Sequence, residues 1–406
     1  MPPSLKSRRE TTREAAVTGP LSPGKPVECL EQERIGAENL IIPYGSTIEH
    51  TDNDVTRIIR PDGSILGWAN DREVDEIPVP DNGFLPTIRV YEVESGSVIN
   101  HQENGNIYIT NSAIKPELYI KEPSAQPTDS KSSHLATNQK EPSINSATIA
   151  DINENWVEFA NQTYSSSTND IASFKARWNV PNKPQETRRN EVPAPRGSTW
   201  TNTTSMAAWM GVESLDSKGL GQGVFQSVLA WNWINDPKYG STEKNWSAAI
   251  WDVGATSSYA ISTHISSNGL AINTGDEMRS TIKYDSSSKK WDGTLTLVPQ
   301  SGTPTEVTFS KNFATLDPKK VDLELVDEAY ILKFNYGKNS TSHLQKYMFS
   351  NVRFTNIEIK NQKGEIISNN FVPYIVKDWN DHKSECPNLD VTIDSNPYKV
   401  WLHTTS

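Results

Sequence analysis

The sequence predicts an all-β protein, and three observations support this fold class. Apolar and β-branched residues recur in short runs, 22 glycines and 25 prolines punctuate the chain, and the 3.6-residue apolar rhythm of a helix is almost absent. A hydrophobic fraction of 35 % suits sheets that keep one face polar. After residue 150 we expect strands that together form a twisted antiparallel β-sandwich: Phe174–Trp178, Ala207–Val212, Val224–Trp233, Ala248–Val253, Tyr259–His264, Ser280–Tyr284, Gly293–Val298, Glu306–Phe309, Ala329–Phe334 and Asn351–Ile359.

Changes in composition divide the chain into four parts. Residues 1–37 are charged and lack periodicity, and residues 121–150 are rich in Ser, Pro, Thr and Gln, so they are predicted to be a disordered arm and a disordered linker. Between them, residues 38–120 contain short β-prone runs separated by turn chemistry such as Pro61-Asp62-Gly63. We expect a small β domain there and the sandwich at residues 151–406.

The small β domain contains an internal repeat of about 51 residues. Tyr44-Gly45-Ser46-Thr47-Ile48-Glu49-His50 matches Ser95-Gly96-Ser97-Val98-Ile99-Asn100-His101 at an offset of 51 positions. Because a single hairpin is marginally stable in water, the two copies are expected to pack on each other. His50 and His101 allow two interpretations: a metal site or, as we favour, a histidine that ends a strand at the same place in each copy.

Charge and composition exclude several classes of function. A net charge of −11 provides no basic face for nucleic acid or for an anionic membrane surface. No segment approaches the ~18 uninterrupted apolar residues that would span a bilayer. The two cysteines, Cys29 and Cys386, offer one potential disulfide, and no Cys/His spacing predicts a zinc site. We expect no cofactor and no metal, and the sequence predicts no particular oligomeric state.

The signals for localisation point in two directions. Lys6, Arg8 and Arg9 are not followed by an apolar stretch, so no secretory signal is predicted and an intracellular protein is the default expectation. Four Asn-x-Ser/Thr sequons would suit a secreted glycoprotein: Asn161, Asn202, Asn245 and Asn339.

Residues 152–365 carry a series of short motifs in a characteristic order. Asn155-Trp156 is followed by Ala176-Arg177-Trp178-Asn179-Val180-Pro181, Ala208-Trp209-Met210-Gly211-Val212, Val224-Phe225-Gln226-Ser227 and Phe354-Thr355. In this order and spacing the motifs resemble those of the fungal glutamic peptidases, or eqolisins. The resemblance implies a concanavalin A-like, eqolisin-type β-sandwich, and the repeat of residues 38–120 lies outside it.

The resemblance also implies a pair of functional residues on a concave face of the sandwich. In the glutamic peptidases a Glu is thought to act as general base and then as general acid, while a Gln holds the water and stabilises the oxyanion. Gln226 occupies the Gln position. In the family, the Glu is followed by an aromatic and two aliphatic residues, which we match to Tyr330-Ile331-Leu332. This match places Ala329 at the Glu position, with Glu328 one residue early and Asp327 two residues away. Gln has no usable pKa, so it cannot transfer the proton by itself.

Strand parity therefore decides what the sequence predicts about activity. Successive side chains of a strand point to opposite faces. Glu328, Tyr330, Leu332 and Phe334 form the bulkier and more apolar set, so they are expected to face the core. That parity leaves Ala329, together with Asp327, in the groove opposite Gln226, and it predicts a pseudo-enzyme.

The chain has twelve tryptophans, and aromatic side chains on a concave sheet can bind sugars or peptides. We expect Trp209, Trp246 and Trp251 to line the groove with Ala329. The leading hypothesis is a non-catalytic relative of the glutamic peptidases that binds an extended peptide or a glycan. The alternatives are an active acid endopeptidase that uses Gln226 with Glu328 or Asp327, and a structural or interaction module that works through the N-terminal repeat.

Overall fold

The computed structural model describes seventeen stretches of the chain, and they are built almost wholly from β-strands. These residues are 22–24, 33–34, 41–74, 76–81, 83–102, 104–111, 118–121, 156–166, 169–185, 205–215, 221–231, 246–254, 259–265, 271–312, 316–329, 348–375 and 389–404. Both cysteines and the sequons at Asn202, Asn245 and Asn339 lie outside the described residues, as do most of the predicted arm and linker. The predicted all-β fold class is confirmed.

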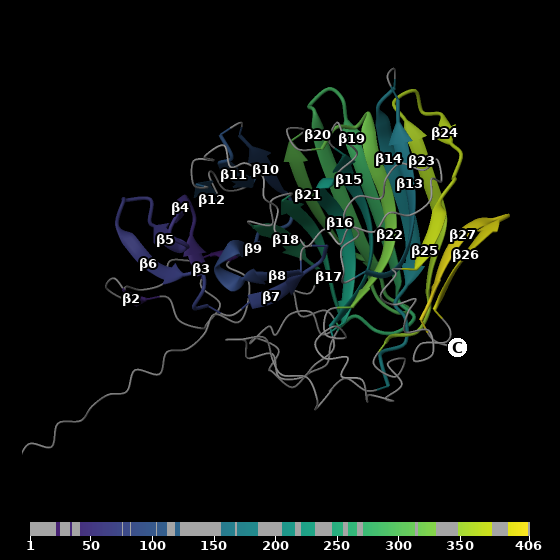
Figure 1. The fold of residues 1–406 in the computed structure, drawn as a ribbon, viewed down its shortest axis with the longest axis horizontal. Coiled ribbons are helices and arrows are strands. Elements are labelled where there is room, and N and C mark those ends of the chain that lie inside the picture. The colour runs from purple at the N-terminus through teal and green to yellow at the C-terminus, as the bar shows by residue number, and fades with distance from the viewer. Residues whose placement is uncertain are drawn as a thin grey trace, which may run out of the picture.

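Two large sheets form the body of the structure (Figure 1). The 15-stranded sheet runs in the order β2 (Glu33–Arg34), β6 (Ile65–Asn70), β5 (Val55–Ile59), β4 (Ser46–His50), β12 (Leu118–Lys121), β11 (Ile107–Asn111), β10 (Ser97–His101), β21 (Thr305–Asn312), β20 (Lys290–Val298), β19 (Glu277–Asp285), β14 (Ile171–Asn179), β23 (Val352–Asn361), β27 (Tyr398–His403) and β26 (Asp390–Ser395), and β24 (Ile366–Ile367) pairs with β23. The 8-stranded sheet runs β25 (Val372–Ile375), β13 (Trp156–Ser165), β22 (Lys320–Ala329), β15 (Met206–Leu215), β16 (Gly221–Trp231), β17 (Trp246–Gly254), β18 (Ala260–His264) and β9 (Val90–Glu92).

Three smaller elements complete the description. β1 (Ser22–Gly24) pairs in parallel with β3 (Ile41–Pro43), and β7 (Glu76–Val79) forms an antiparallel pair with β8 (Gly83–Pro86). A single 3-10 turn, η1 (Thr87–Arg89), leads from β8 into β9. The turn between β7 and β8 contacts the 8-stranded sheet, through Gln226 on β16 and Glu328 on β22.

The two sheets pack face to face, and their burial patterns differ. The rings of Phe225 on β16 and Phe309 on β21 lie 6.0 Å apart, and Ser280 Oγ on β19 donates to Ser227 Oγ on β16 at 2.7 Å. Strands such as β20 alternate between buried and half-buried residues, which is the pattern of a sheet with one solvated face. β15 and β17 are buried on nearly every residue, so both faces of the 8-stranded sheet are covered.

Most predicted strands of the sandwich match observed ones, but one is displaced. The predicted runs fall on β14 to β21 and on β23. The run predicted at Ala329–Phe334 is displaced, because β22 extends over Lys320–Ala329 and residues 330–334 lie outside the described residues. β13, β25, β26 and β27 were not predicted.

The N-terminal repeat extends the larger sheet of the sandwich. Gly45 and Gly96 both adopt positive φ, at 78° and 88°, directly before the equivalent strands β4 and β10. β4 pairs with β12 and β10 pairs with β21, each in parallel. The two copies therefore lie side by side in one sheet, whereas the sequence led us to expect that they pack on each other.

His50 ends β4 within a network of buried side chains. Its Nδ1 lies 2.7 Å from Thr56 Oγ1 and its Nε2 lies 2.6 Å from Tyr91 Oη. Burial, and then the charge of Arg89, holds the pKa of His50 well below its usual value. Both ring nitrogens contact protein side chains, which fits a structural histidine.

His101 ends β10 and joins the repeat to the sandwich. Its Nε2 lies 2.8 Å from Asp252 Oδ2 on β17, and Tyr259 Oη lies 3.1 Å from its Nδ1. Lys311 Nζ contacts the other oxygen of Asp252, and all three charged groups are buried. Burial disfavours the carboxylate, but the charges of Lys311 and His101 outweigh it and hold the pKa of Asp252 at about 2.

Candidate functional site

The candidate site lies on the face of the 8-stranded sheet that points away from the 15-stranded sheet, which we call the outer face. Phe225 and Ser227 contact the other sheet, so Gln226 between them points to the outer face. β16 and β15 pair Gln226 with Gly211, and β15 and β22 pair Gly211 with Glu324. Directly opposed residues of antiparallel strands share a face, so Gln226 and Glu324 belong to the same side of the sheet.

The parity predicted near residue 329 is wrong. β22 pairs Glu328 with Ala207 and Val326 with Trp209, which places Glu328 on the outer face with Gln226. The indole Nε1 of Trp209 donates to Glu328 Oε2 at 3.0 Å. Ala329 alternates with Glu328 and therefore faces the interior of the sandwich.

The cause of the reversal is the position of the strand. Within the observed strand, every second residue from Val321 to Leu325 is apolar and fully buried: Val321, Leu323 and Leu325. These three residues determine which side chains of β22 face the interior of the sandwich. Asp327 belongs to this interior set, where β13 and β22 pair it with Glu158. Burial raises the pKa of Asp327 well above its usual value. Burial, and then the charge of Asp327, raises the pKa of Glu158 well above its usual value.

The three tryptophans predicted to line the groove divide between the two faces. Trp251 pairs with Gln226 across β16 and β17, and Trp209 lies on the neighbouring strand, so both are on the outer face. Trp246 pairs with Trp231 on the interior side and packs edge-on against it with ring centroids 5.1 Å apart. Trp209 and Trp251 are buried, at 0 % and 1 % exposure, so neither presents a ring to solvent.

Gly211 lies between Gln226 and Glu324 on the outer face, because it pairs with each of them across a neighbouring strand. A Cβ at this position would lie 3.0 Å from Trp209 Cζ3 and 3.1 Å from Gln226 Cβ, so no larger residue fits without displacement. Gln226 is 0 % exposed and Glu324 is 2 % exposed. Gln226 Oε1 and Glu324 Oε2 have no hydrogen-bond partner among the described residues. Unpaired buried oxygens are costly unless a polar group, such as a water, reaches them.

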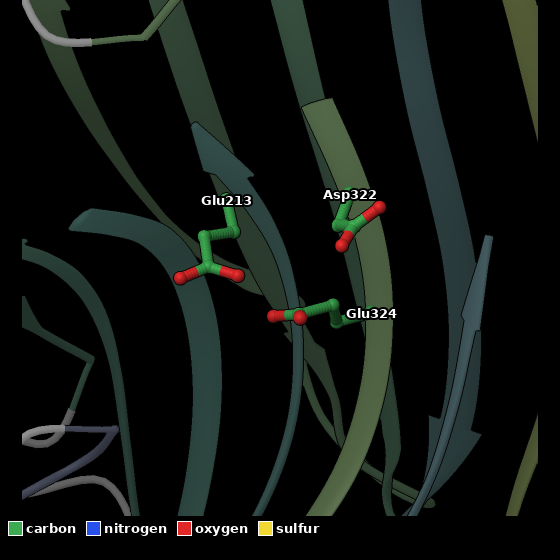
Figure 2. A group of neighbouring side chains, drawn as sticks. All are labelled: Glu213, Asp322 and Glu324. Atoms are coloured by element: carbon green, nitrogen blue, oxygen red, sulfur yellow. The ribbon is translucent and has the colours of Figure 1, made fainter. Parts of the chain in front are cut away.

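Glu324 belongs to a group of three acidic residues that we call the carboxyl cluster: Glu213, Asp322 and Glu324. Their carboxylate oxygens all lie within 4.8 Å of one another, the one such group of metal-ligand type in the described part of the chain. Figure 2 shows Glu213 and Glu324 pointing toward one another from β15 and β22. Burial raises the pKa of Glu324 well above its usual value, and the nearby charges of Glu213, Asp81 and Asp322 raise it further.

The cluster has the chemistry of a proton site more than that of a metal site. A hard cation would require ionised carboxylates. Carboxylate oxygens of Glu213 and Glu324 lie within 4.8 Å of one another, and burial raises the pKa of both Glu324 and Asp322. Close carboxyl groups resist ionising together, so this arrangement favours a protonated Glu324 on the face that carries Gln226.

The backbone of the β7–β8 turn occupies the outer face. Gln226 Nε2 donates to the carbonyl oxygen of Pro80 at 3.0 Å. The backbone N–H of Asp81 donates to Glu328, 3.1 Å from Oε1 and 3.2 Å from Oε2. Asp81 has a φ of 67°, in the left-handed region, which costs a non-glycine residue about 1 kcal/mol or more. Burial raises the pKa of the Asp81 carboxyl to about 7.

Sequence reasoning placed Gln226, Trp209 and Trp251 on this face but missed Glu324 and Pro80-Asp81. A signal for Glu324 was present in the strict alternation of Val321-Asp322-Leu323-Glu324-Leu325, which is the pattern of a strand with one apolar and one acidic face. Pro80-Asp81-Asn82-Gly83 has the residue types of a turn, but no local pattern places it at the site, because Gln226 lies 146 residues from Pro80 and Glu328 lies 247 residues from Asp81.

Comparisons with known proteins add little to the identity of the chain. No family model and no curated protein matches it. Among solved structures it is similar to peanut lectin with the nine-residue peptide PVIWSSATG, at 14 % sequence identity and a TM-score of 0.23, over 57 % of this chain and 81 % of the lectin chain. The resemblance to the glutamic peptidases thus remains one of motif order. No helix in the described part of the chain has the length and hydropathy needed to cross a bilayer.

Proposed function

We propose that the outer face is the active site of an acid endopeptidase of glutamic type, in which Gln226 and Glu324 carry out the hydrolysis. The observation that carries the proposal is their position on one buried face, on either side of Gly211. Each keeps one oxygen without a partner among the described residues, so a water between them would find two acceptors. The motif order that resembles the glutamic peptidases agrees with this assignment at Gln226.

Each residue has a defined part in the reaction. Glu324, whose raised pKa keeps it protonated in acid, passes its proton to Glu213 as it takes one from the water, whose oxygen then bonds to the carbonyl carbon of the peptide. The Gln226 amide nitrogen donates to the carbonyl oxygen as it becomes negative, as it already donates to Pro80. When the carbon–nitrogen bond breaks, Glu324 gives a proton to the leaving nitrogen and takes back the one held by Glu213, so the pair ends the cycle with one proton as it began.

The carboxyl cluster supports action in acid. Two close carboxyl groups resist ionising together, so the pair of Glu213 and Glu324 keeps one shared proton over a wide range of pH. One carboxylate can then serve as base while its neighbour holds the acid form. At higher pH both ionise, the proton store is lost, and hydrolysis should decline.

The geometry favours a peptidase over the non-catalytic groove that the sequence suggested. That hypothesis depended on Ala329 lying opposite Gln226, and Glu324 occupies this place instead. A glycan would need an accessible aromatic platform, whereas Trp209 and Trp251 are buried. A peptide backbone is already bound by Gln226 and Glu328.

A digestion assay on the full chain tests the proposal. Reduced and carboxymethylated protein substrate is incubated with the chain from pH 2.5 to 7.5, and products are identified by mass spectrometry. We expect cleavage that is strongest in acid, with kcat/KM lowered about 10²-fold or more by Gln226→Ala or by the isosteric Glu324→Gln. Gln102→Ala and Glu306→Gln, which alter exposed residues of the same types, serve as controls. Wild-type rates in either site variant would refute the assignment.

A further inference from the structure

Lys311 and Asp252 meet across the interior of the sandwich. Lys311 lies on β21 of the 15-stranded sheet and Asp252 lies on β17 of the 8-stranded sheet, and Lys311 Nζ contacts Asp252 Oδ1. The two side chains are 2 % and 0 % exposed, so bulk water does not reach the contact. An amine and a carboxyl group from different sheets are therefore held together away from solvent.

Aromatic rings surround this contact. The centroid of the Phe225 ring lies 5.9 Å from Lys311 Nζ, and Phe309 packs against Phe225 with the ring centroids 6.0 Å apart. Burial among such rings penalises charged groups, so it lowers the free-energy cost of moving a proton from the lysine to the carboxylate. The low pKa of Asp252 shows that the ion pair is the resting form. The neutral pair is the minor form, and its desolvated amine is a nucleophile.

The second oxygen of Asp252 is held by His101. The Nε2 of His101 lies 2.8 Å from Asp252 Oδ2, and Tyr259 Oη lies 3.1 Å from its Nδ1. An ionised carboxylate only accepts hydrogen bonds, so Nε2 carries a proton and donates it to Oδ2. Such a donor stabilises the negative charge that develops on Oδ2 when the carboxyl carbon is attacked.

We propose that Lys311 and Asp252 condense to an amide, which links the two sheets of the sandwich covalently. A proton passes from Lys311 Nζ to Asp252 Oδ1, and the neutral amine then bonds to the Cγ of Asp252. A second proton moves from the nitrogen to Oδ1, the bond from Cγ to Oδ1 breaks, and Oδ1 leaves as water. Oδ2 becomes the amide oxygen and keeps its hydrogen bond to His101. The lysine supplies both protons of the water, so the reaction needs no oxidant and no co-reactant.

The fold supplies the driving force for a condensation that is unfavourable between free groups in water. Well-oriented intramolecular reactions have effective molarities of about 10⁵–10⁸ M. The amide also replaces a buried ion pair, whose desolvation is costly. Gln226 and Glu324 take no part, so the inference is independent of the proposed function.

A second lysine–carboxylate pair provides the matched control. Lys175 Nζ on β14 donates to Glu358 Oε1 on β23 at 2.9 Å, but these side chains are 38 % and 30 % exposed. Water solvates both charges there, so the lysine stays protonated and no amide is expected.

The intact mass of the purified full chain, measured in denaturant, tests for the bond. We expect a mass about 18 Da below that of the sequence, because one water is lost. Trypsin does not cleave after an acylated lysine, so digestion should yield a branched peptide that joins residues 245–279 to residues 291–319. A chain of full mass without the branched peptide would overturn the proposal.

Lys311→Arg keeps a positive charge beside Asp252 but removes the nucleophilic amine. This variant should have its full mass, whereas Lys175→Arg should still show the loss of water. A cyclised aspartate, for example at Asp62-Gly63, would lose the same mass without forming a branched peptide. A loss of water that persists in Lys311→Arg would therefore overturn the cross-link. If Lys311→Arg does not fold, the presence or absence of the branched peptide in the wild-type chain decides.

The role of His101 is tested by the rate at which the bond forms after cell-free synthesis. Samples are denatured at intervals, and the cross-linked fraction is read from the intact mass. His101→Phe should form the bond about 10²-fold more slowly than wild type. His50→Phe, the same change at the equivalent histidine of the repeat, should form it at the wild-type rate. A wild-type rate in His101→Phe would overturn the donor role of His101.

Discussion

Replacing Gly211 with alanine should damage the site through a single methyl group. The new Cβ would lie 3.0 Å from Trp209 Cζ3, 3.1 Å from Gln226 Cβ and 3.1 Å from Val224 Cγ1, all on buried side chains that have little room to move. Overpacking of this kind costs about 1–3 kcal/mol. The reduced freedom of the unfolded chain returns about 0.4–1 kcal/mol. The net loss in the free energy of unfolding should be roughly 0.5–2 kcal/mol.

The methyl group would also press on Gln226 itself and on the ring of Trp209, which donates to Glu328. A displacement of about 1 Å in a catalytic group can cost about 10²-fold in rate, so Gly211→Ala should slow peptide cleavage by at least tenfold. The assay combines urea denaturation, which gives the free energy of unfolding, with the rate at which an added protein substrate is cleaved well below the unfolding midpoint.

Gly293→Ala is the matched control for the same measurement. Its Cβ would lie 2.9 Å from Phe225 Cζ and 3.1 Å from Ile250 Cγ2, so the crowding is similar but falls on the interior face. It should reduce stability to a comparable degree and leave the cleavage rate unchanged. If both variants lose stability and neither loses rate, Gly211 matters for packing alone and the position of Gln226 does not control the reaction.

Three further measurements follow from the buried charges. Asp252→Asn would leave Lys311 buried without its counter-ion and should lower the free energy of unfolding by about 3–5 kcal/mol. The control Asp292→Asn, on the half-buried side of β20, should lower it by less than about 1 kcal/mol. Equal losses in urea denaturation would contradict the importance of the buried pair. Glu158 and Asp327 have raised pKa values in the folded protein, so their contribution to stability is complete below about pH 4 and is lost as the pH rises. The free energy of unfolding should therefore fall by up to about 1.4 kcal/mol per pH unit for each group. A free energy of unfolding that increases between pH 4 and 7 would refute this. Cleavage should be unaffected by EDTA or by added calcium, because the carboxyl cluster holds a proton; loss of activity with EDTA that calcium restores would show a metal site.

The fold class and one of the two proposed catalytic residues, Gln226, could be predicted from the sequence, because both depend on patterns within single strands. Alternation of apolar residues is a property of each strand by itself, so β14 to β21 could be located without knowing their partners. Gln226 was singled out by its strand motif, and it lies on the outer face of the 8-stranded sheet, opposite Gly211.

The error at residue 329 arose because parity was judged over the wrong window. The residues from Tyr330 onward have an apolar set that suggests one parity, while Val321, Leu323 and Leu325 inside the true strand impose the opposite one. A shift of one residue exchanges the two faces completely. An alternating pattern therefore predicts a face only when the limits of the strand are known.

The occupant of the site could not be predicted, because long-range sheet pairing brings it there. β9 pairs in parallel with β18, and β10 pairs in parallel with β21, so the chain just after the β7–β8 turn is fixed to both sheets of the sandwich. The buried contact of His101 with Asp252 strengthens this attachment. Eight residues separate Asp81 from Val90, the first residue of β9, and β8 and η1 lie between them. A segment this short, anchored at one end, keeps the turn close to the outer face at all times. The strands of the N-terminal repeat thus hold the Pro80–Asp81 bond against Gln226 and Glu328. This role could not be predicted from the residues of the repeat.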